Sequence, residues 1–294
     1  MSGEGAGPPF TDVRGRGFGP RASVGSVLAL LDARVRPLGS EPVAPAEAAG
    51  RVLAGPVASA VDVPAFAKSA MDGFAVRAAD TDPPRPLRVV GEAFPARPFA
   101  GVVDPGEAAR VTTGAPVPAG ADAVLMVELA HSEPEGKVSA RAPVSPGKHV
   151  VRVGEDVAAG REVLSAGRVL RPQDVGLLAA IGVTSVAVVR RPRVAVLVTG
   201  NELLPPGAPP DGFKIIDSNS PMLSALATRD GAAVQPTQYV ADDFAAVRDA
   251  IRDAAAGADV VLVSGGTSVG AEDHVPRAVA GAGELAVHGV ALRP

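Results

Sequence analysis

The sequence contains no cysteine and no tryptophan, and Tyr239 is its only tyrosine. Without cysteine, the chain can form neither a disulfide framework nor a thiolate zinc site, and it has no cysteine nucleophile. Aromatic residues make up only 3% of the chain, so it lacks platforms on which single-stranded nucleic acids could stack their bases. The 28 Lys and Arg against 32 Asp and Glu give a net charge of −4, which is not the basic footprint of a nucleic-acid-binding protein.

Long hydrophobic runs are also missing. No segment reaches the length of about 18 apolar residues that a membrane span requires. Residues 1–22 are rich in Gly, Pro and Arg and lack the apolar core of a signal peptide, so we expect a disordered arm there and a cytoplasmic protein. Hydrophobic residues nevertheless make up 47% of the 294 residues, which is enough to build folded cores.

The residue pattern of the N-terminal half changes twice along the chain. Apolar spacing predicts a helix over 24–35 and a second short helix over 44–54. From 61 to 147, Pro and Gly separate short Val-rich runs, and we expect strands at 87–90, 109–112, 123–127 and 137–142. A helix over 173–180 and a strand over 186–189 follow. We expect residues 148–190 to fold back onto 23–60 as one discontinuous helical domain, which makes 61–147 an inserted β domain.

Residues 191–294 follow a clearer order. The apolar runs at 194–198 and 259–263 are typical of strands buried on both faces. Between them the pattern indicates a helix over 222–229, a strand over 234–240 and a helix over 242–256. This alternation predicts a doubly wound parallel sheet, so the expected fold class is α/β with several domains.

Two loops at the carboxyl ends of predicted strands combine glycines with acids. In an open α/β sheet, ligands bind outside these strand ends. Gly265, Gly266 and Gly270 would let a phosphate approach the backbone, while Glu202 and Asp273 supply carboxylates that suit a divalent cation. A glycine-rich turn that only caps a helix is the competing interpretation, because such motifs are not specific by themselves.

Six motifs in one order closely resemble the MoeA family of molybdopterin molybdenumtransferases, which is related to the gephyrin E domain, and the resemblance runs from about residue 23 to the last residue. The motifs are Ser69–Ala75, Thr113–Pro118, Gly154–Asp156, Thr199–Leu203, Asp217–Asn219 and Ser264–Gly270 with Asp273.

The resemblance implies a homodimer that inserts molybdate into adenylylated molybdopterin and releases AMP with the help of Mg2+. A molybdopterin adenylyltransferase would then act upstream. It also implies a helical domain made from two chain segments, an inserted β domain and a doubly wound molybdopterin-binding domain. The family's C-terminal β domain is expected to be absent, because the chain stops at Pro294 where the family continues with Pro-Gly-Lys-Pro.

The resemblance also assigns residues by motif. Asp72 and Thr113 would face the active site of the partner subunit, and Glu202 with Asp273 would hold the metal. The implied catalytic residues are Glu202, Asp273, Asp72 and Asp156. The implied substrate-binding residues are Thr113, Asp217, Ser218, Asn219, Asp242, Gly265, Gly266, Thr267, Ser268, Gly270 and Arg293. Two positions depart from the family: Gly289 replaces one frequent basic residue, and Asn201 stands where some relatives have Asp.

Three other functions remain open from the sequence. A pterin adenylyltransferase shares the doubly wound fold, but residues 23–190 argue against it because such enzymes resemble the α/β domain alone. A scaffold like gephyrin would need an appended interaction region. A molybdopterin-binding protein without catalysis would bind the pterin and release no AMP.

Overall fold

The computed structural model describes residues 21–265 and 274–292. Residue contacts divide the chain into two compact units. The first unit comprises residues 1–41 and 189–294, and the second comprises residues 42–188. Most of the arm expected at 1–22 lies outside the described residues.

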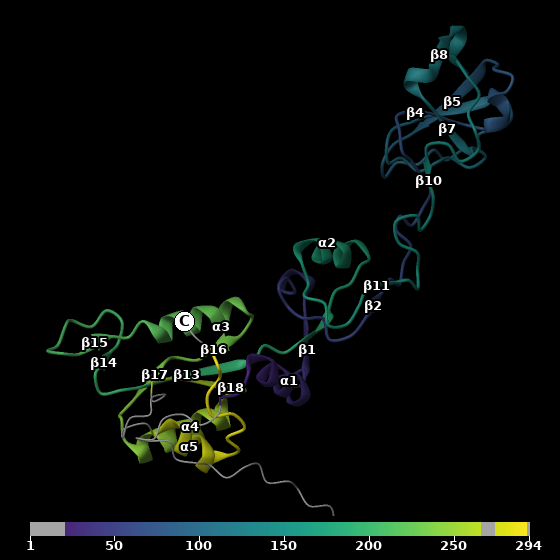
Figure 1. The fold of residues 1–294 in the computed structure, drawn as a ribbon. Coiled ribbons are helices and arrows are strands. Elements are labelled where there is room, and N and C mark those ends of the chain that lie inside the picture. Colours follow the sequence, from purple (N-terminus) through teal and green to yellow (C-terminus); the bar gives the residue numbers. More distant parts are fainter. Residues whose placement is uncertain (1–20, 266–273, 293–294) are drawn as a thin grey trace, which may run out of the picture. The chain divides into compact units, whose positions relative to one another are not determined.

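The first unit is built around a parallel sheet (Figure 1). Its central strand β13 pairs with β16 and β17 along one edge and with β18 along the other, and all three pairings are parallel. A second pair, β14 and β15, is also parallel. The elements in chain order are α1 (Val24–Arg34), β13 (Arg193–Thr199), β14 (Leu203–Leu204), β15 (Ile215–Ile216), α3 (Asn219–Arg229), β16 (Ala233–Val234), β17 (Gln238–Val240), α4 (Phe244–Gly257), β18 (Val260–Ser264) and α5 (Val275–Ala282).

Helices cover both faces of this sheet (Figure 1). On the face of α3, Val194 and Val196 form a buried cluster. On the face of α4 and α5, Leu197 packs against Val247 and Ala278. Because alternate residues of β13 serve opposite cores, the strand is apolar throughout its buried length. The predicted doubly wound sheet is confirmed.

The second unit carries most of the antiparallel structure. Its elements are β1 (Ser40–Val43), which begins in the first unit, η1 (Pro45–Glu47), β2 (Val57–Ala58), β3 (Lys68–Ser69), β4 (Gly73–Val76), η2 (Ala78–Thr81), β5 (Leu87–Ala93), β6 (Glu107–Val111), β7 (Ala123–Met126), η3 (Val127–Leu129), β8 (Ala130–Glu133), η4 (Pro134–Gly136), β9 (Lys137–Ala140), β10 (Val150–Val151), β11 (Glu162–Leu164), α2 (Pro172–Ala180) and β12 (Val186–Val189). The two-stranded pairs are β1 with β12, β3 with β10 and β2 with β11.

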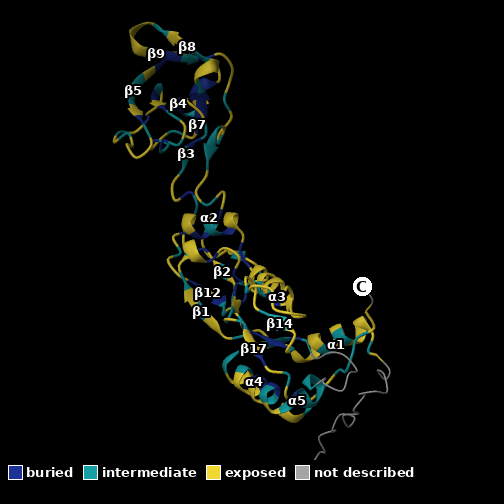
Figure 2. Ribbon diagram, turned by 90° about the vertical axis from the view of Figure 1, so that its left-hand side faces the viewer, coloured by how far each residue is buried: buried dark blue, intermediate teal, exposed yellow. Residues whose placement is uncertain are grey.

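Six strands of this unit form one sheet in the order β7-β4-β6-β5-β9-β8. Only β5 and β6 pair in parallel within it. One core of the sheet contains Val76, Leu87 and Leu125, and a second contains Val111 and Val124. Buried residues accordingly follow β4 and β7 (Figure 2). The strands expected at 87–90, 109–112, 123–127 and 137–142 correspond to β5, β6, β7 and β9.

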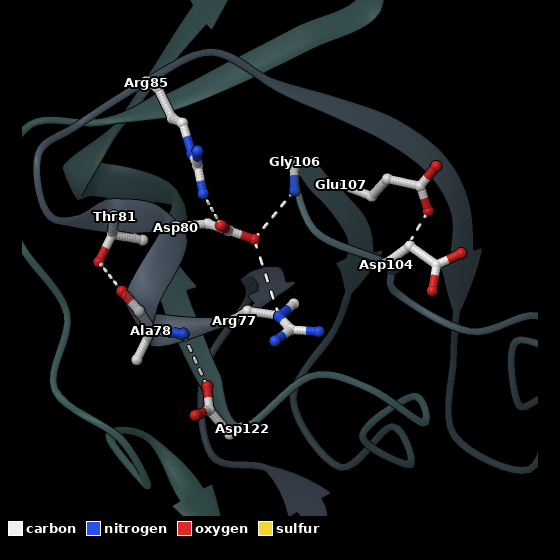
Figure 3. A network of polar contacts seen from close by, with 9 residues as sticks. All are labelled: Arg77, Ala78, Asp80, Thr81, Arg85, Asp104, Gly106, Glu107 and Asp122. Atoms are coloured by element: carbon white, nitrogen blue, oxygen red, sulfur yellow. Dashed lines mark hydrogen bonds and ion pairs between the residues drawn. The ribbon is translucent and has the colours of Figure 1, made fainter.

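A network of carboxylates holds the loops of this sheet together (Figure 3). The buried Asp80 carboxylate accepts hydrogen bonds from the Arg85 guanidinium and, at 2.9 Å, from the N–H of Gly106. The Asp122 carboxylate accepts the N–H of Ala78 at 2.7 Å. Both carboxylates have internal donors, so they stabilise the sheet and are not candidates for a functional site.

A separate core surrounds α2, where Leu53, Leu178 and Val188 are buried. Pro172 occupies the first turn of α2, and the carboxylate of Asp174 accepts the N–H of Arg171 at 2.9 Å. Proline and an acid are favoured at these positions because the first N–H groups of a helix have no partner inside it. The predicted helix over 173–180 is confirmed.

Three expected elements differ from the structure. The helix expected over 44–54 is only the short turn η1, and Leu53 then pairs in a strand-like bridge with Val188. The strand expected over 234–240 is divided into β16 and β17, because Pro236 between them has no N–H for the sheet. The helix α1 groups with the first unit instead of with the expected helical domain at 23–60: Ala22 pairs with Val290, and Arg34 bonds Glu284 at 2.8 Å.

No helix among the described residues is long and apolar enough to cross a membrane.

Candidate functional site

Three strands of the first unit end side by side. The register places Thr199 of β13 beside Val240 of β17, and Val198 beside Ser264 of β18. The loops that follow these strands therefore leave the sheet at one edge, its carboxyl edge. Ligands of doubly wound sheets bind at this edge, so the loops form the candidate site of this unit.

Glycines shape the first turn of two of these loops. Gly265 has a φ of +99°, and a Cβ there would lie 2.2 Å from the carbonyl oxygen of Thr199. Gly200 has a φ of +135°, and a Cβ there would lie 2.8 Å from the carboxylate oxygens of Glu202. A side chain at either position would be strained and would collide with its neighbour. Glycine is thus favoured at both positions by the positive φ, and at Gly265 also by the close backbone of Thr199.

Two acids lie on neighbouring loops of the same edge. Glu202 is exposed, and Asp242 is partly exposed. The side-chain oxygen of Asn201 accepts the N–H of Asp242 at 3.2 Å, which connects the loop after β13 to the loop after β17. Asp243, the next residue, caps α4 by accepting the N–H groups of Ala245 and Ala246, so Asp242 is not needed for the helix.

Asp217 lies below the start of α3 and is almost completely buried, with 3% of its surface exposed. Its carboxylate accepts the N–H of Asn219 at 2.9 Å, the hydroxyl of Tyr239 at 2.9 Å, and both the N–H and the hydroxyl of Ser220. Burial alone would raise the pKa of Asp217, but these hydrogen bonds outweigh it and hold the pKa below its usual value.

The expected direct contact of Asp217 with substrate therefore differs from the structure. A carboxylate with four internal donors has no free acceptor site of its own, and it fixes the first turn of α3 instead. Ser218 and Asn219 are exposed at that turn. They remain the residues of the motif that a ligand could reach.

In the second unit, the structure brings Asp72 and Thr113 together. The Asp72 carboxylate accepts the N–H of Thr113 at 2.6 Å and its hydroxyl at 2.9 Å. These two bonds, with a smaller contribution from the charge of Arg110, hold the pKa of Asp72 below its usual value. Asp72 is exposed. It is therefore an ionised acid in a fixed orientation at the end of β4.

Asp156 lies in a turn of the second unit and is also exposed. Its N–H donates to the carbonyl oxygen of Val63 at 3.0 Å, so the backbone of the turn is fixed. Gly154 has a φ of +68°, and a Cβ there would lie 2.8 Å from the carboxylate of Asp62. The Gly-Glu-Asp motif thus presents its last acid from a turn whose first residue favours glycine.

The expected site residues divide into three groups. Asp72, Thr113 and Asp156 belong to the second unit, whereas Glu202, Asp217, Ser218, Asn219, Asp242 and Gly265 belong to the first. The remaining ones, Gly266, Thr267, Ser268, Gly270, Asp273 and Arg293, lie outside the described residues.

The sequence interpretation did not include Ser220 and Tyr239, the two side chains that donate to Asp217, and it named Thr199 only as part of a motif, without a role. Ser220 could have been found as the hydroxyl three residues after an acid, which is the spacing of a helix cap. Nothing in the sequence around Tyr239 predicts its hydrogen bond to Asp217, because the folded sheet brings these two residues together. Thr199 ends β13 and is buried.

The described residues do not show the metal site that the resemblance implies. Within 21–265 and 274–292, no three His, Cys, Asp or Glu side chains are grouped so that they could hold an ion. Glu202 is an exposed oxygen donor of the kind that Mg2+ prefers, and Asp273 falls outside the description. The donor chemistry at the carboxyl edge fits a hard cation that keeps several waters.

Comparison with known proteins connects both units to one family. Residues 22–182 match the family model of the MoeA N-terminal region (domain I and II), and residues 195–294 match that of a probable molybdopterin binding domain. Two solved structures of the MoeA molybdopterin biosynthesis protein from Pyrococcus horikoshii have TM-scores of 0.80 and 0.78 with this chain, at 31% and 34% identity. They cover 94% and 84% of this chain and 70% and 67% of their own.

Curated relatives agree with these matches. The chain is 43% identical over 234 residues to molybdopterin molybdenumtransferase 2 of Mycobacterium tuberculosis (strain ATCC 25618 / H37Rv), and 35% identical over 248 residues to molybdopterin molybdenumtransferase of Haemophilus influenzae. These matches cover 78% and 84% of this chain but only 58% and 61% of the relatives, so the chain spans about three fifths of their length. The two domain models, the solved structures and the curated relatives together show that the chain belongs to the MoeA family.

Proposed function

We propose that this chain acts in molybdenum cofactor biosynthesis as a molybdopterin molybdenumtransferase, inserting molybdate into adenylylated molybdopterin with release of AMP. The observation that carries the proposal is that both family models match one chain, in order, over 22–182 and 195–294. The relatives that share this arrangement bear that name. The match to the N-terminal region also counts against a pterin adenylyltransferase, which would resemble the α/β part alone.

The charges of the site favour a cation between protein and substrate. Molybdate and the adenylyl phosphate are anions, and the carboxyl edge presents the acids Glu202 and Asp242. Carboxylates would repel the substrates unless a divalent cation separated them. We propose that Glu202 and Asp273 hold Mg2+, which supplies a positive charge to the phosphate oxygens when bound.

The chain's own groups then bind and orient the anions. Ser218 and Asn219 are exposed at the first turn of α3, and we propose that their side chains donate hydrogen bonds to the anionic oxygens. Asp217 positions this turn from below. The proposed phosphate cradle is the loop that begins at Gly265, with Gly266, Thr267, Ser268 and Gly270, and Arg293 is a further proposed anion contact.

The release of AMP requires one proton acceptor. We propose that Glu202 or Asp273 takes a proton from the water that attacks the adenylyl phosphorus. A new P–O bond then forms to this water, and the P–O bond to the molybdopterin phosphate breaks. The electron pair of the broken bond leaves with molybdopterin, and AMP is the other product. A positioned base of this kind contributes typically about 100- to 10,000-fold.

The test is AMP release from adenylylated molybdopterin in the presence of molybdate and Mg2+, measured by chromatography. Glu202→Gln should lower the rate at least about 100-fold. Asp211→Asn is the matched control, because Asp211 is an exposed acid of the same unit paired only with Lys214 in a surface ion pair. A rate that is equal in the two variants would contradict the proposed role of Glu202, and pterin binding without AMP release would favour a non-catalytic binding protein.

We also propose that the protein is a homodimer in which Asp72 and Thr113 of one subunit complete the site of the other. The support is the Asp72 carboxylate, which is exposed and which the hydrogen bonds from Thr113 hold in a fixed orientation. Coexpression of Asp72→Asn with Glu202→Gln tests this, because half of randomly mixed dimers would hold one intact site of two. The mixture should regain up to about a quarter of the wild-type activity. Activity no higher than that of either variant alone would contradict sharing.

The same proposal covers Asp156, the cellular location and the upstream partner. Asp156 is proposed as a further acid of the site, and Asp156→Asn should lower AMP release without changing unfolding. The reaction is proposed to occur in the cytoplasm, which cell fractionation would test. Its substrate is proposed to come from a molybdopterin adenylyltransferase, and a pull-down with that enzyme would test direct transfer.

A further inference from the structure

One buried hydroxyl at the carboxyl edge has no hydrogen-bond partner. Thr199 is only 3% exposed, and among the described residues its Oγ1 has no hydrogen-bond partner. Burying a hydroxyl without a partner costs folding free energy, since the group loses its bonds to water. Valine has nearly the same shape and would avoid this cost. The fold alone therefore does not need the hydroxyl at this position.

The hydroxyl lies where two strands end against each other. A Cβ built on Gly265 would be 2.8 Å from Thr199 Oγ1, so the hydroxyl is next to the first residue of the loop after β18. Gly200 directly follows it with a positive φ. Neither flanking glycine places a side chain beside this hydroxyl, and close approach to a ligand is one reason for such glycines.

Two other buried hydroxyls among the described residues have partners. The Thr81 hydroxyl donates to the carbonyl oxygen of Ala78 at 2.7 Å, and the Ser220 hydroxyl donates to Asp217. Among the described residues, the other hydroxyl buried without a partner is that of Thr112, the neighbour of Thr113. Unpartnered hydroxyls are thus confined to the two places where expected site residues occur.

We propose that the Thr199 hydroxyl binds the ligand, donating a hydrogen bond to an anionic oxygen of phosphate type at the carboxyl edge. This inference rests on the proposed function and adds a residue that the motif assignments did not include. The hydroxyl can donate this bond because no internal acceptor competes for its proton. Hydrogen bonds to charged oxygens are stronger than those between neutral groups. In the complex, such a bond offsets the free energy that burial of the unpartnered hydroxyl costs.

The test replaces Thr199 with valine in the full chain and measures stability and binding separately. Stability is read from urea unfolding followed by the emission of Tyr239, which belongs to the same unit and is the only tyrosine in a chain without tryptophan. Binding is read by calorimetry with AMP and Mg2+. Thr199→Val should unfold at an unchanged or higher urea concentration but bind AMP about 10- to 100-fold more weakly.

Two further variants make the result specific. Thr199→Ser keeps the hydroxyl and should bind AMP within about threefold of the wild type, since only a methyl group is lost. Thr228→Val makes the same chemical change at an exposed position of α3 and should alter neither property. Full AMP affinity in Thr199→Val would overturn the inference. A clear loss of stability in that variant would also overturn it, because the hydroxyl would then have a structural partner.

The outcomes also separate this inference from the proposed function. Failure of the wild-type chain to bind AMP would contradict both. Binding of AMP that depends on the Thr199 hydroxyl, without AMP release from adenylylated molybdopterin, would support the inference and contradict the transferase.

Discussion

Replacement of Asp217 by alanine tests the internal role that the structure gives to this acid. Asp217→Ala removes the acceptor for two N–H groups at the start of α3, a loss that costs about 1 kcal/mol at a typical helix cap. It also leaves the Ser220 hydroxyl, 2% exposed, without its partner, which costs about 1–3 kcal/mol. The hydroxyl of Tyr239 adds little, because this residue is 37% exposed and can turn to water. The expected loss is therefore about 3 kcal/mol.

The assay is urea unfolding followed by tyrosine emission. Since Tyr239 is the only tyrosine and tryptophan is absent, the signal comes from one residue that bonds Asp217 directly. It reports the first unit and excludes unfolding of the second. Asp211→Ala is the control, because it removes an exposed acid of the same unit and should change stability by less than about 0.5 kcal/mol.

The same variant predicts a pH dependence. The pKa of Asp217 is lower in the folded protein than the value of about 3.9 that an unfolded chain has. Its carboxylate therefore stabilises the fold above this value, and the stabilisation is lost as the pH falls through the folded pKa. The difference between wild type and Asp217→Ala should shrink between about pH 5 and pH 2. A difference that stays constant with pH, or a loss no larger than in the control, would refute the reasoning.

Three further substitutions follow from particular contacts. Gly73→Ala places a Cβ 2.0 Å from the carbonyl oxygen of Leu125 and should destabilise the six-stranded sheet by more than about 1 kcal/mol, seen as faster hydrogen exchange in β4 and β7. Gly265→Ala collides with Thr199 and should lower the urea midpoint of the tyrosine signal. Asp174→Asn breaks the ion pair with Arg168, which holds the pKa of this buried acid below its usual value. The backbone amides of α2 should therefore exchange faster than in the wild type at pH 7. This difference should diminish as the pH falls through the pKa that Asp174 has in the folded protein. Unchanged exchange or midpoints in these variants would contradict the contacts.

The parallel sheet was predictable because its strands serve two cores. The apolar run at 194–198 has no polar residue, which indicates a strand covered on both faces before any partner is known. The division at Pro236 was predictable in principle, since proline cannot donate to a sheet. The grouping of α1 was not, because its contacts with the first unit join residues far apart in the sequence, such as Arg34 and Glu284, which are 250 positions apart.

The candidate site was also only partly predictable from the sequence. The motif Asp217-Ser-Asn predicts cap-type residues before a helix, and α3 begins at Asn219. Sequence cannot say that the acid faces inward, because one of its donors, Tyr239, comes from a strand that the sheet brings beneath α3. The orphaned Thr199 hydroxyl is likewise invisible in sequence, since threonine is common in strands.

The proposed function requires that this chain couple AMP release to molybdenum insertion. The direct measurement is the ratio of the two products from adenylylated molybdopterin, molybdate and Mg2+. AMP is quantified by chromatography, and cofactor is quantified by activation of a molybdenum-free apoenzyme. The account predicts equal amounts of AMP and active cofactor, both lost in Glu202→Gln. AMP release without cofactor formation, or neither product from the wild-type chain, would contradict it.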